Sequence, residues 1–356
     1  MGPILPPYTG QAVAFTAVID ELQKTNKCIV IDIANKDKWL NGIVLCFSIV
    51  VKVLFFNYDC VYFTCSRTKI GSIRDVVLLL CARVKGVRVV NHLHGADYIT
   101  FFSTLPPFYQ KIVYWSYSYI DTGIVLLDEM RSQFDSYKNM NIKVVHNFYS
   151  SAFDQLPVYK QLNDNDNIKM LYFSNLMKTK GILNLLDAAM ILLDKYENLC
   201  LSVAGEIYGD YELSLDQMKD EVNKRFDSLY STYPDRFKYY GVCTGDTKTK
   251  LFWDSDVFVL PTFYLTEAVP LTLIEAMRSG NYLITTDHNY LPGIVSEDFG
   301  SIIDTDSVQA IVIGVDEFYN SRAKYHTISN HNINFAIENY SEKLYLQNVL
   351  EIIFEK

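Results

Sequence analysis

The sequence predicts an α/β protein with two doubly wound domains, and three observations support this prediction. The chain has 356 residues, about twice the length of a typical domain of roughly 150 residues. Short apolar runs alternate with longer segments of helical periodicity, as they do in strand–helix–strand units around a parallel sheet. The alternation stops in a polar stretch, residues 159–167, and then begins again.

The first half of the chain contains five apolar runs of strand length. They span residues 29–33, 61–64, 87–93, 123–127 and 143–146. Runs that are apolar along most of their length are typical of parallel strands covered on both faces. Only residues 2–5 precede the first turn, so we expect the opening strand of this domain to be vestigial or to begin upstream.

The second half continues with six runs, at residues 170–173, 201–204, 237–240, 257–260, 283–286 and 301–303. Helical patterns separate most of them, notably at 182–196, 213–229 and 271–279. Apolar residues recur through 337–354 and predict one terminal helix. The expected organisation is a domain at 1–150, a linker at 151–167, a domain at 168–330 and a C-terminal helix at 331–356.

Composition narrows the class of protein. Hydrophobic residues make up 49% of the chain and charged residues 21%, which excludes a disordered or fibrous protein. Seven cysteines, an odd number without C-x-x-C spacing, predict buried, reduced thiols in a cytoplasmic protein. The longest apolar run, residues 43–56, includes Lys52 and is too short to span a bilayer.

Charge is unevenly distributed along the chain. Residues 1–150 hold 15 Lys and Arg against 11 Asp and Glu, although the whole chain carries −9. Six basic residues cluster in the first half: Arg67, Lys69, Arg74, Arg83, Lys85 and Arg88. A solvated helix face and a surface for anionic lipid headgroups or a pyrophosphate both fit this cluster. The acidic total and the absence of a binding motif argue against nucleic acid.

Residues 257–280 form the most informative segment. After a buried strand and a loop, a helix is expected to begin near Pro270, because proline suits the first helical turn. The free N–H groups of Leu271 and Thr272, with the helix dipole, would then form an anion site.

Two carboxylates flank this helix start, at Glu267 and Glu275. Their positions suit one group that holds sugar hydroxyls and another that holds a ribose diol. The E-x7-E spacing taken alone fits an ordinary surface helix equally well.

Taken together, the strand, the loop, the E-x7-E helix and Gly280 resemble the retaining glycosyltransferases of family 4. These enzymes have the GT-B fold, in which two Rossmann-like domains face each other across a cleft. Further segments resemble the family in the same order along the chain: residues 6–11, 90–97, 145–147, 171–182, 204–206 and 240–242. The resemblance covers essentially the whole chain.

The resemblance implies that a sugar is moved from a nucleoside diphosphate sugar to a hydroxyl acceptor. The first domain would bind the acceptor, the second the nucleotide sugar, and the C-terminal helix would cross back to the first domain. The catalytic residues implied are Glu267, His94 and Lys180. The donor-binding residues implied are Glu275, Lys178, Asn175, Ser174, Ala268, Val269, Leu271, Thr272, Gly10, Gln11, Gly205 and Val242. Apart from the donor substrate, no cofactor and no metal is expected.

The sequence departs from the family pattern at three places. Ser174 and Asn175 replace the usual Gly and Arg, so Lys180 would neutralise the pyrophosphate alone or with Lys178. Gln11 replaces the second glycine of the N-terminal loop. Gly293 follows Pro292 where the family often has a glutamate, so no acidic residue is carried over there.

Some residues suggest metal chemistry without further support. The Asp254-Ser-Asp256 segment has the Asp-x-Asp form of metal-dependent glycosyltransferases, but a turn before the following strand explains it better. Asp164 and Asp166 are expected in a polar linker. His92 and His94 could share a face of a strand, yet no third zinc ligand is evident.

Three other functions fit parts of the pattern. A GT-B nucleotide-sugar epimerase or a catalytically silent GT-B subunit would share the fold. A nicotinamide dehydrogenase is disfavoured because no G-x-G-x-x-G follows a strand. The preferred setting is surface-polysaccharide or O-antigen assembly on a glycan or lipid-linked saccharide, in the cytoplasm at the inner face of the membrane, with peripheral, electrostatic membrane contact.

Overall fold

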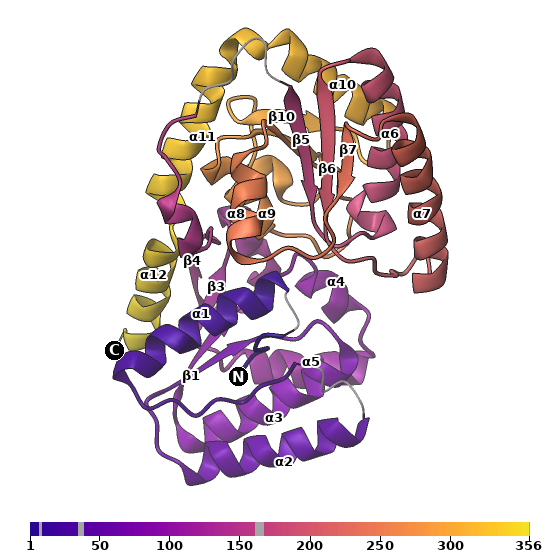
Figure 1. Ribbon diagram of the computed structural model, residues 1–356. Helices are drawn as coiled ribbons and strands as arrows, with labels where there is room; N and C mark the ends of the chain where they lie inside the picture. Colours follow the sequence, from indigo (N-terminus) through magenta and orange to yellow (C-terminus); the bar gives the residue numbers. More distant parts are fainter. Residues whose placement is uncertain (7–8, 35–38, 161–166, 356) are drawn as a thin grey trace. The chain divides into compact units, whose positions relative to one another are not determined.

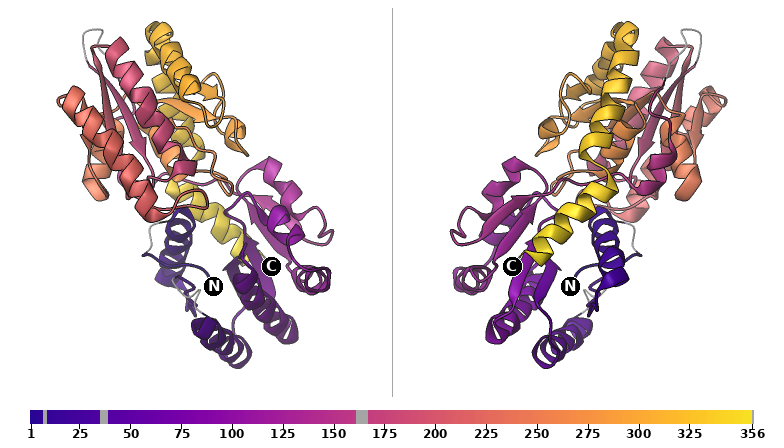
Figure 2. Two further views of the ribbon diagram at one scale, coloured as in Figure 1. Left: turned by 90° about the vertical axis from the view of Figure 1, so that its right-hand side faces the viewer. Right: turned by 90° about the vertical axis from the view of Figure 1, so that its left-hand side faces the viewer.

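The computed structural model describes residues 1–6, 9–34, 39–160 and 167–355, with only the backbone of 39–41 (Figure 1). The chain divides into two compact units. Unit 1 comprises Met1–Asn147 with Lys343–Lys356, and unit 2 comprises Phe148–Glu342. Figure 2 gives two further views of their elements. The polar stretch that contains Asp164 and Asp166 lies outside the described residues.

Unit 1 is built on a parallel sheet of four strands in the order β1-β2-β3-β4. The strands are β1 (Cys60–Thr64), β2 (Arg88–His92), β3 (Thr122–Val125) and β4 (Asn141–Val144). The predicted strand at 29–33 is wrong: it is reduced to a single parallel bridge between Asp32 and Gly2. Gly2 forms backbone hydrogen bonds with Ile31 and Ile33, and among the described residues this short contact alone continues the sheet beyond β1.

Helices cover both faces of this sheet. On one face lie α1 (Gly10–Thr25) and α12 (Glu342–Phe354), since Phe15 and Tyr345 pack with the rings of Tyr62 and His92. The other face carries α2 (Trp39–Phe55), α3 (Lys69–Lys85), α4 (Tyr98–Ser103) and α5 (Pro107–Tyr117), with η1 (Asp128–Phe134) beyond. Helix α3 packs between α2 and α5.

Unit 2 has a parallel sheet of six strands in the order β10-β9-β8-β5-β6-β7. These are β5 (Ile168–Phe173), β6 (Leu199–Ala204), β7 (Phe237–Tyr239), β8 (Val257–Leu260), β9 (Tyr282–Thr286) and β10 (Gly300–Ile303). All six predicted strands are confirmed. The order reverses beside β5, so the loops after β5 and β8 lie next to each other, where ligands of open α/β sheets bind.

Two groups of helices pack on the sheet of unit 2. One group is α6 (Ile182–Lys195), α7 (Leu215–Thr232) and α10 (Val308–Asn320). The other is α8 (Gly245–Trp253), α9 (Leu271–Arg278) and α11 (Tyr325–Asn339). In α7 the capping box of Ser214 and Gln217 fixes the first turn, as the Ser-x-x-Gln pattern predicts.

The predicted single helix at 337–354 is wrong, because the chain breaks at residues 340–341 between α11 and α12. There the Tyr149 N–H donates to the carbonyl of Tyr340, and Tyr149 bridges to Ser341. Within unit 1, the Arg88 guanidinium donates to the carbonyls of Ile352 and Ile353 at 2.7 and 3.1 Å. The last turn of α12 is therefore fixed by its carbonyl groups.

All seven cysteines are free thiols, of which Cys65 and Cys81 are buried and the others half-buried. Burial raises the pKa of Cys60 to about 11, even though Arg88 lies nearby. Among the described residues, no helix combines the length and apolar character needed to cross a membrane.

Candidate functional site

Loops at the carboxyl ends of β5, β6 and β8 meet closely in unit 2. Gly181 has a φ of 78°, and a Cβ there would lie 2.1 Å from the carbonyl oxygen of Pro261. Gly205 has a φ of 142°, and a Cβ would lie 1.8 Å from the carbonyl oxygen of Ser174. Both positions need glycine because the backbone is left-handed and another chain segment passes at contact distance.

Lys180 and Glu267 form an ion pair between two of these loops. The Lys180 ammonium donates to Glu267 Oε2, and the hydroxyl of Thr262 donates to the same oxygen at 3.2 Å. The two charged side chains are only 14% and 9% exposed. The ammonium also lies 4.9 Å from the ring centre of Tyr264. Two residues predicted to be catalytic are thus in direct contact.

The turn that carries Lys180 is anchored by two further carboxylates. Lys178 Nζ lies 2.5 Å from Glu212 Oε2, and the hydrogen bond between them raises the pKa of Lys178. The backbone N–H and the hydroxyl of Thr179 both donate to Asp210 Oδ2 at 2.9 Å. Burial opposes ionisation of Asp210, but these hydrogen bonds lower its pKa overall. Segment 210–212 therefore fixes turn 178–180.

Several predicted donor-binding residues lie along the same edge of the sheet. The Ser174 N–H donates to the carbonyl of Ala204 at 3.2 Å, and the exposed Asn175 accepts a hydrogen bond at its carbonyl from Tyr172. Gly205 N–H donates to the carbonyl of Gly241 at 2.8 Å, which places the exposed Val242 beside it.

The start of α9 follows Pro270 without a side-chain cap. Ala268 and Val269 are buried just before it, and Leu271 and Thr272 are half-buried in its first turn. The first N–H groups of an α-helix have no acceptor within the helix. The N–H groups of Leu271 and Thr272 are accordingly suited to an anion.

Glu275 belongs to a second ion pair. Its Oε1 accepts a hydrogen bond from Lys248 Nζ at 2.6 Å, whereas Oε2 is buried and has no hydrogen-bond partner among the described residues. The side chain is 3% exposed, and burial raises its pKa while Lys248 opposes the rise. The rings of Phe173 and Phe252 lie 5.4 and 5.9 Å from the Lys248 ammonium.

In unit 1, His94 lies after β2 and stacks on His92, with ring centres 4.1 Å apart. Burial and the nearby Arg67 lower the pKa of His94 to about 3, so the imidazole is neutral. Its Nε2 is buried and has no partner among the described residues. Arg67 forms an ion pair with Asp97 at 2.5 Å. The Arg67 guanidinium therefore holds the segment 94–97, which is predicted to contact the sugar.

Gly10 and Gln11 are the first two residues of α1. Thr9 caps this helix, since its hydroxyl accepts a hydrogen bond from the Ala12 N–H at 3.2 Å. Of the predicted loop at 6–11, residues 7 and 8 lie outside the described residues.

The Asp-x-Asp segment shows turn chemistry. Asp256 Oδ2 accepts a hydrogen bond from the Lys169 N–H at 2.9 Å, which joins the start of β8 to β5, and Asp254 ends α8. No group of three or more metal-ligating side chains occurs within the described parts of the chain. Asp256 thus supports strand pairing.

Four residues that hold this site together were not among the predicted site residues: Lys248, Thr262, Asp210 and Glu212. Lys248 lies 27 positions before Glu275 and belongs to no motif, so only the packing of α8 against α9 reveals the pair. Asp210 and Glu212 lie in a loop of ordinary polar residues. Thr262 alone had a signal, because it directly follows the predicted strand end.

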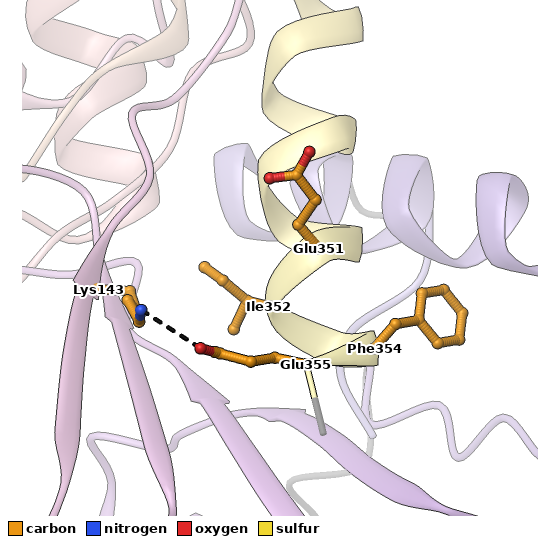
Figure 3. Close-up of a pocket in the computed structure, with 5 residues that line it drawn as sticks. All are labelled: Lys143, Glu351, Ile352, Phe354 and Glu355. Carbon is orange, nitrogen blue, oxygen red and sulfur yellow. Dashed lines mark ion pairs between the residues drawn. The ribbon is translucent and has the colours of Figure 1, made fainter.

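A shallow hollow of about 330 Å³ lies in unit 1, at the end of α12 (Figure 3). It is lined by Lys143, Glu351, Ile352, Phe354 and Glu355. Lys143 already pairs with Glu355 at 3.6 Å. The one cation of the lining is therefore paired, and Glu351 accepts a hydrogen bond from the uncharged Gln347, so the hollow is acidic and does not suit an anionic donor.

Solved structures of several glycosyltransferases share this fold. A glycosyltransferase from Rickettsia africae matches with a TM-score of 0.72 and 16% identity, over 99% of this chain and 97% of that one. HepE from Anabaena in complex with UDP matches with a TM-score of 0.67 and 15% identity, over 89% of this chain and 84% of that one. Sucrose-phosphate synthase from Thermosynechococcus elongatus matches with a TM-score of 0.64 and 15% identity, over 90% of this chain and 79% of that one. These matches confirm the predicted GT-B fold.

The sequence itself was also compared with protein families and with curated proteins. None of the curated proteins matches it. The family model described as glycosyl transferases group 1 matches residues 158–335, which is half of the chain and contains the site built above from Lys180, Glu267 and Glu275. This chain therefore belongs to the glycosyl transferases group 1 family.

Proposed function

We propose that this protein transfers a sugar from a UDP-sugar to a hydroxyl group of a lipid-linked or polysaccharide glycan, with retention at the anomeric carbon. The observation that carries the proposal is the Lys180–Glu267 pair beside the uncapped start of α9. UDP as the nucleotide is supported by similar structures: HepE was solved with UDP-glucose, and Staphylococcus aureus TarM with UDP.

Binding of the donor would begin with an exchange of partners. A diphosphate offers Lys180 a stronger anion than the single carboxylate of Glu267, and it also accepts hydrogen bonds from Leu271 and Thr272. Glu267, released from the ammonium, would then accept hydrogen bonds from the hydroxyls of the donor sugar. Ser174, Asn175, Gly205 and Val242 would line the nucleotide.

The ribose would be held at Glu275. Lys248 occupies one oxygen of this carboxylate, and the other has no partner among the described residues. A ribose hydroxyl can supply the missing hydrogen bond after a small shift of the side chain. Lys248 thus opposes the rise in the pKa of Glu275 that burial causes, and it orients the carboxylate.

The chemical step would need little acid–base catalysis from side chains. As the glycosidic bond breaks, the departing diphosphate takes the acceptor proton on the same face of the sugar. Lys180 and the start of α9 stabilise the charge that grows on the leaving phosphate. The neutral His94 would contact the sugar from unit 1, with Gly10 and Gln11 near the donor and the acceptor bound by unit 1.

No metal is part of this proposal. Lys180, Lys178 and the helix start would neutralise the diphosphate, so activity is expected to survive chelation by EDTA. Loss of activity in EDTA with recovery in Mn²⁺ would contradict this. The setting we propose is the cytoplasmic face of a membrane, in surface-polysaccharide or O-antigen assembly.

The test is a donor screen followed by a transfer assay. UDP-, GDP-, ADP- and dTDP-sugars are compared by thermal shift, where a ligand at 100 times its Kd adds about 2.7 kcal/mol of stability. Donors that bind are then incubated with glycan acceptors, and the released nucleotide and product are measured. Binding without turnover would indicate a silent subunit, and isomerisation of the sugar without an acceptor would indicate an epimerase.

A further inference from the structure

The outward faces of α2 and α3 in unit 1 are apolar although they are exposed. We define the α2–α3 apolar face by six residues that are each 48–77% exposed: Ile43, Val44, Phe47, Phe55, Ile70 and Ile73. Val84, at the far end of α3, is 82% exposed. Isolated apolar residues are common on protein surfaces, but a continuous face of this kind marks an interaction site.

The helical spacing shows that this is one surface. Val44, Phe47, Val51 and Phe55 are three or four positions apart, so they form a stripe along α2 opposite the buried residues Leu45, Ile49 and Val53. On α3, the positions of Ile70, Ile73, Val77 and Val84 repeat in the same way. A Cβ on Gly42 would lie 4.0 Å from the Ile70 side chain, which joins the two stripes at one end. Figure 1 shows the two helices side by side.

The charge of the two helices identifies the partner. Helix α2 has no acidic residue, and the one in α3, Asp75, is fully buried against Tyr117 and Arg74. The basic residues Lys69 and Arg83 are exposed beside the apolar stripe. The surface therefore suits a partner that has an apolar interior and negative charges on its surface.

The rest of the basic cluster is engaged within the protein. Arg67 pairs with Asp97, and Arg74 with Asp75. Lys85 donates to the carbonyls of Leu54 and Phe56, and Arg88 holds the end of α12. An electrostatic contact with an anionic surface, as predicted from this cluster, would therefore depend mainly on Lys69 and Arg83, the two of the six that have no hydrogen bond or ion pair among the described residues.

We propose that the α2–α3 apolar face inserts into the boundary of an anionic lipid bilayer, with Lys69 and Arg83 on the headgroups. Helices with one apolar face and basic flanks bind the plane of the interface in this way. Arg83 lies 4.4 Å from the ring centre of Trp115 on α5, and this half-exposed tryptophan is of the type enriched at membrane interfaces. A symmetric dimer through this face would instead bring Lys69 and Arg83 of both copies together.

The test is vesicle sedimentation with neutral substitutions, so that the net charge stays constant. Wild-type protein is mixed with vesicles of phosphatidylcholine alone or with about 30 mol% phosphatidylglycerol, whose anionic headgroups make the surface potential negative, at low and high salt. The test variant is Phe47→Gln/Phe55→Gln. The matched control is Ile191→Gln/Ile313→Gln, two 48% exposed residues on α6 and α10 of unit 2.

We expect wild type and control to bind anionic vesicles and to keep part of that binding at high salt. The test variant should lose at least tenfold in apparent affinity with unchanged thermal stability. Equal binding of test variant and wild type, or wild type that stays in every supernatant, would overturn the proposal. A wild-type dimer in analytical ultracentrifugation that Phe47→Gln/Phe55→Gln converts to a monomer would assign the face to a second copy instead. The measurement needs neither donor nor acceptor, so it is independent of the proposed function.

Discussion

Lys180 and Lys178 are two positions apart but have different surroundings. The Lys180 side chain lies against Glu267 and is 14% exposed, whereas the Lys178 side chain, paired with Glu212, is 37% exposed. Charge on the leaving phosphate grows in the transition state, so the buried ammonium should act mainly on turnover.

Replacement of Lys180 by alanine is therefore expected to lower kcat by about 10²–10³, the range for loss of one preorganised electrostatic group. Lys178→Ala should mainly raise KM for the donor. Steady-state kinetics with saturating donor separates the two effects. If saturating donor restores full turnover to Lys180→Ala, its proposed role is wrong.

The Lys248–Glu275 pair can be tested through the pH dependence of stability. Lys248→Met removes the cation beside a buried carboxylate and should lower the free energy of unfolding by about 3 kcal/mol at pH 8. Burial already raises the pKa of Glu275, and loss of the ammonium raises it further. The folded variant then binds a proton that the unfolded chain does not, so its stability recovers as the pH falls.

Urea denaturation of wild type and Lys248→Met at pH 8 and pH 5 measures this effect. The difference in the free energy of unfolding between the two proteins should be smaller at pH 5 than at pH 8. An equal difference at both pH values would show that Glu275 is not left as an unpaired charge.

His94 predicts a pH effect of opposite sign. Its pKa is lowered to about 3 from an ordinary value of 6.5, so between these values only the unfolded chain binds the proton. Stability should fall as the pH drops below 6.5, by up to about 1.4 kcal/mol per pH unit from this group. His94→Gln should have a shallower dependence between pH 6.5 and 4.5 in the same denaturation experiment, and an unchanged slope would contradict the burial of this imidazole.

At the level of secondary-structure elements, strands that have a neighbouring strand on each side were predictable from the sequence. Residues 257–260 are apolar throughout and form β8 with the predicted bounds, because both faces of a central parallel strand are covered. Residues 29–33 are also apolar except for Asp32, yet among the described residues they pair only with Gly2 and form no ladder. Apolar periodicity also continues across Tyr340, where tertiary hydrogen bonds end α11, so the break between α11 and α12 has no signal in the periodicity.

Two left-handed glycines, Gly86 in unit 1 and Gly181 in unit 2, should respond differently to replacement by alanine. Gly86 ends α3 with a φ of 69° and has no neighbour within 4 Å of a Cβ, so Gly86→Ala should cost about 1 kcal/mol from backbone conformation alone. Gly181→Ala adds a collision with the Pro261 carbonyl and should cost about 3 kcal/mol. Chemical denaturation compares the two, and equal losses would mean that the loops after β5 and β8 are not in contact.

For the whole molecule, the sequence was informative where function depends on local geometry and less so where distant segments meet. Pro270, Glu267 and Gly181 are recognisable because a helix start, a loop carboxylate and a left-handed turn each have local requirements. The ion partners of Lys178, Glu275 and Arg67 come from other loops and helices. No spacing rule connects such residues, so their ion pairs could not be predicted from the sequence.

The central claim is that the loops after β5 and β8, with the start of α9, bind the UDP moiety of the donor. Calorimetric titration of UDP into the full chain tests it most directly, with Lys180→Ala and Glu275→Ala as test variants. The control is Lys195→Ala on α6, whose exposed ion pair with Asp316 lies away from these loops. We predict one site per chain, unchanged by Lys195→Ala and weakened by about 1.5–3 kcal/mol in Glu275→Ala, the range for a hydrogen bond to a charged group, with a smaller loss in Lys180→Ala. No binding of UDP to wild type, or equal affinity in all four proteins, would contradict the account.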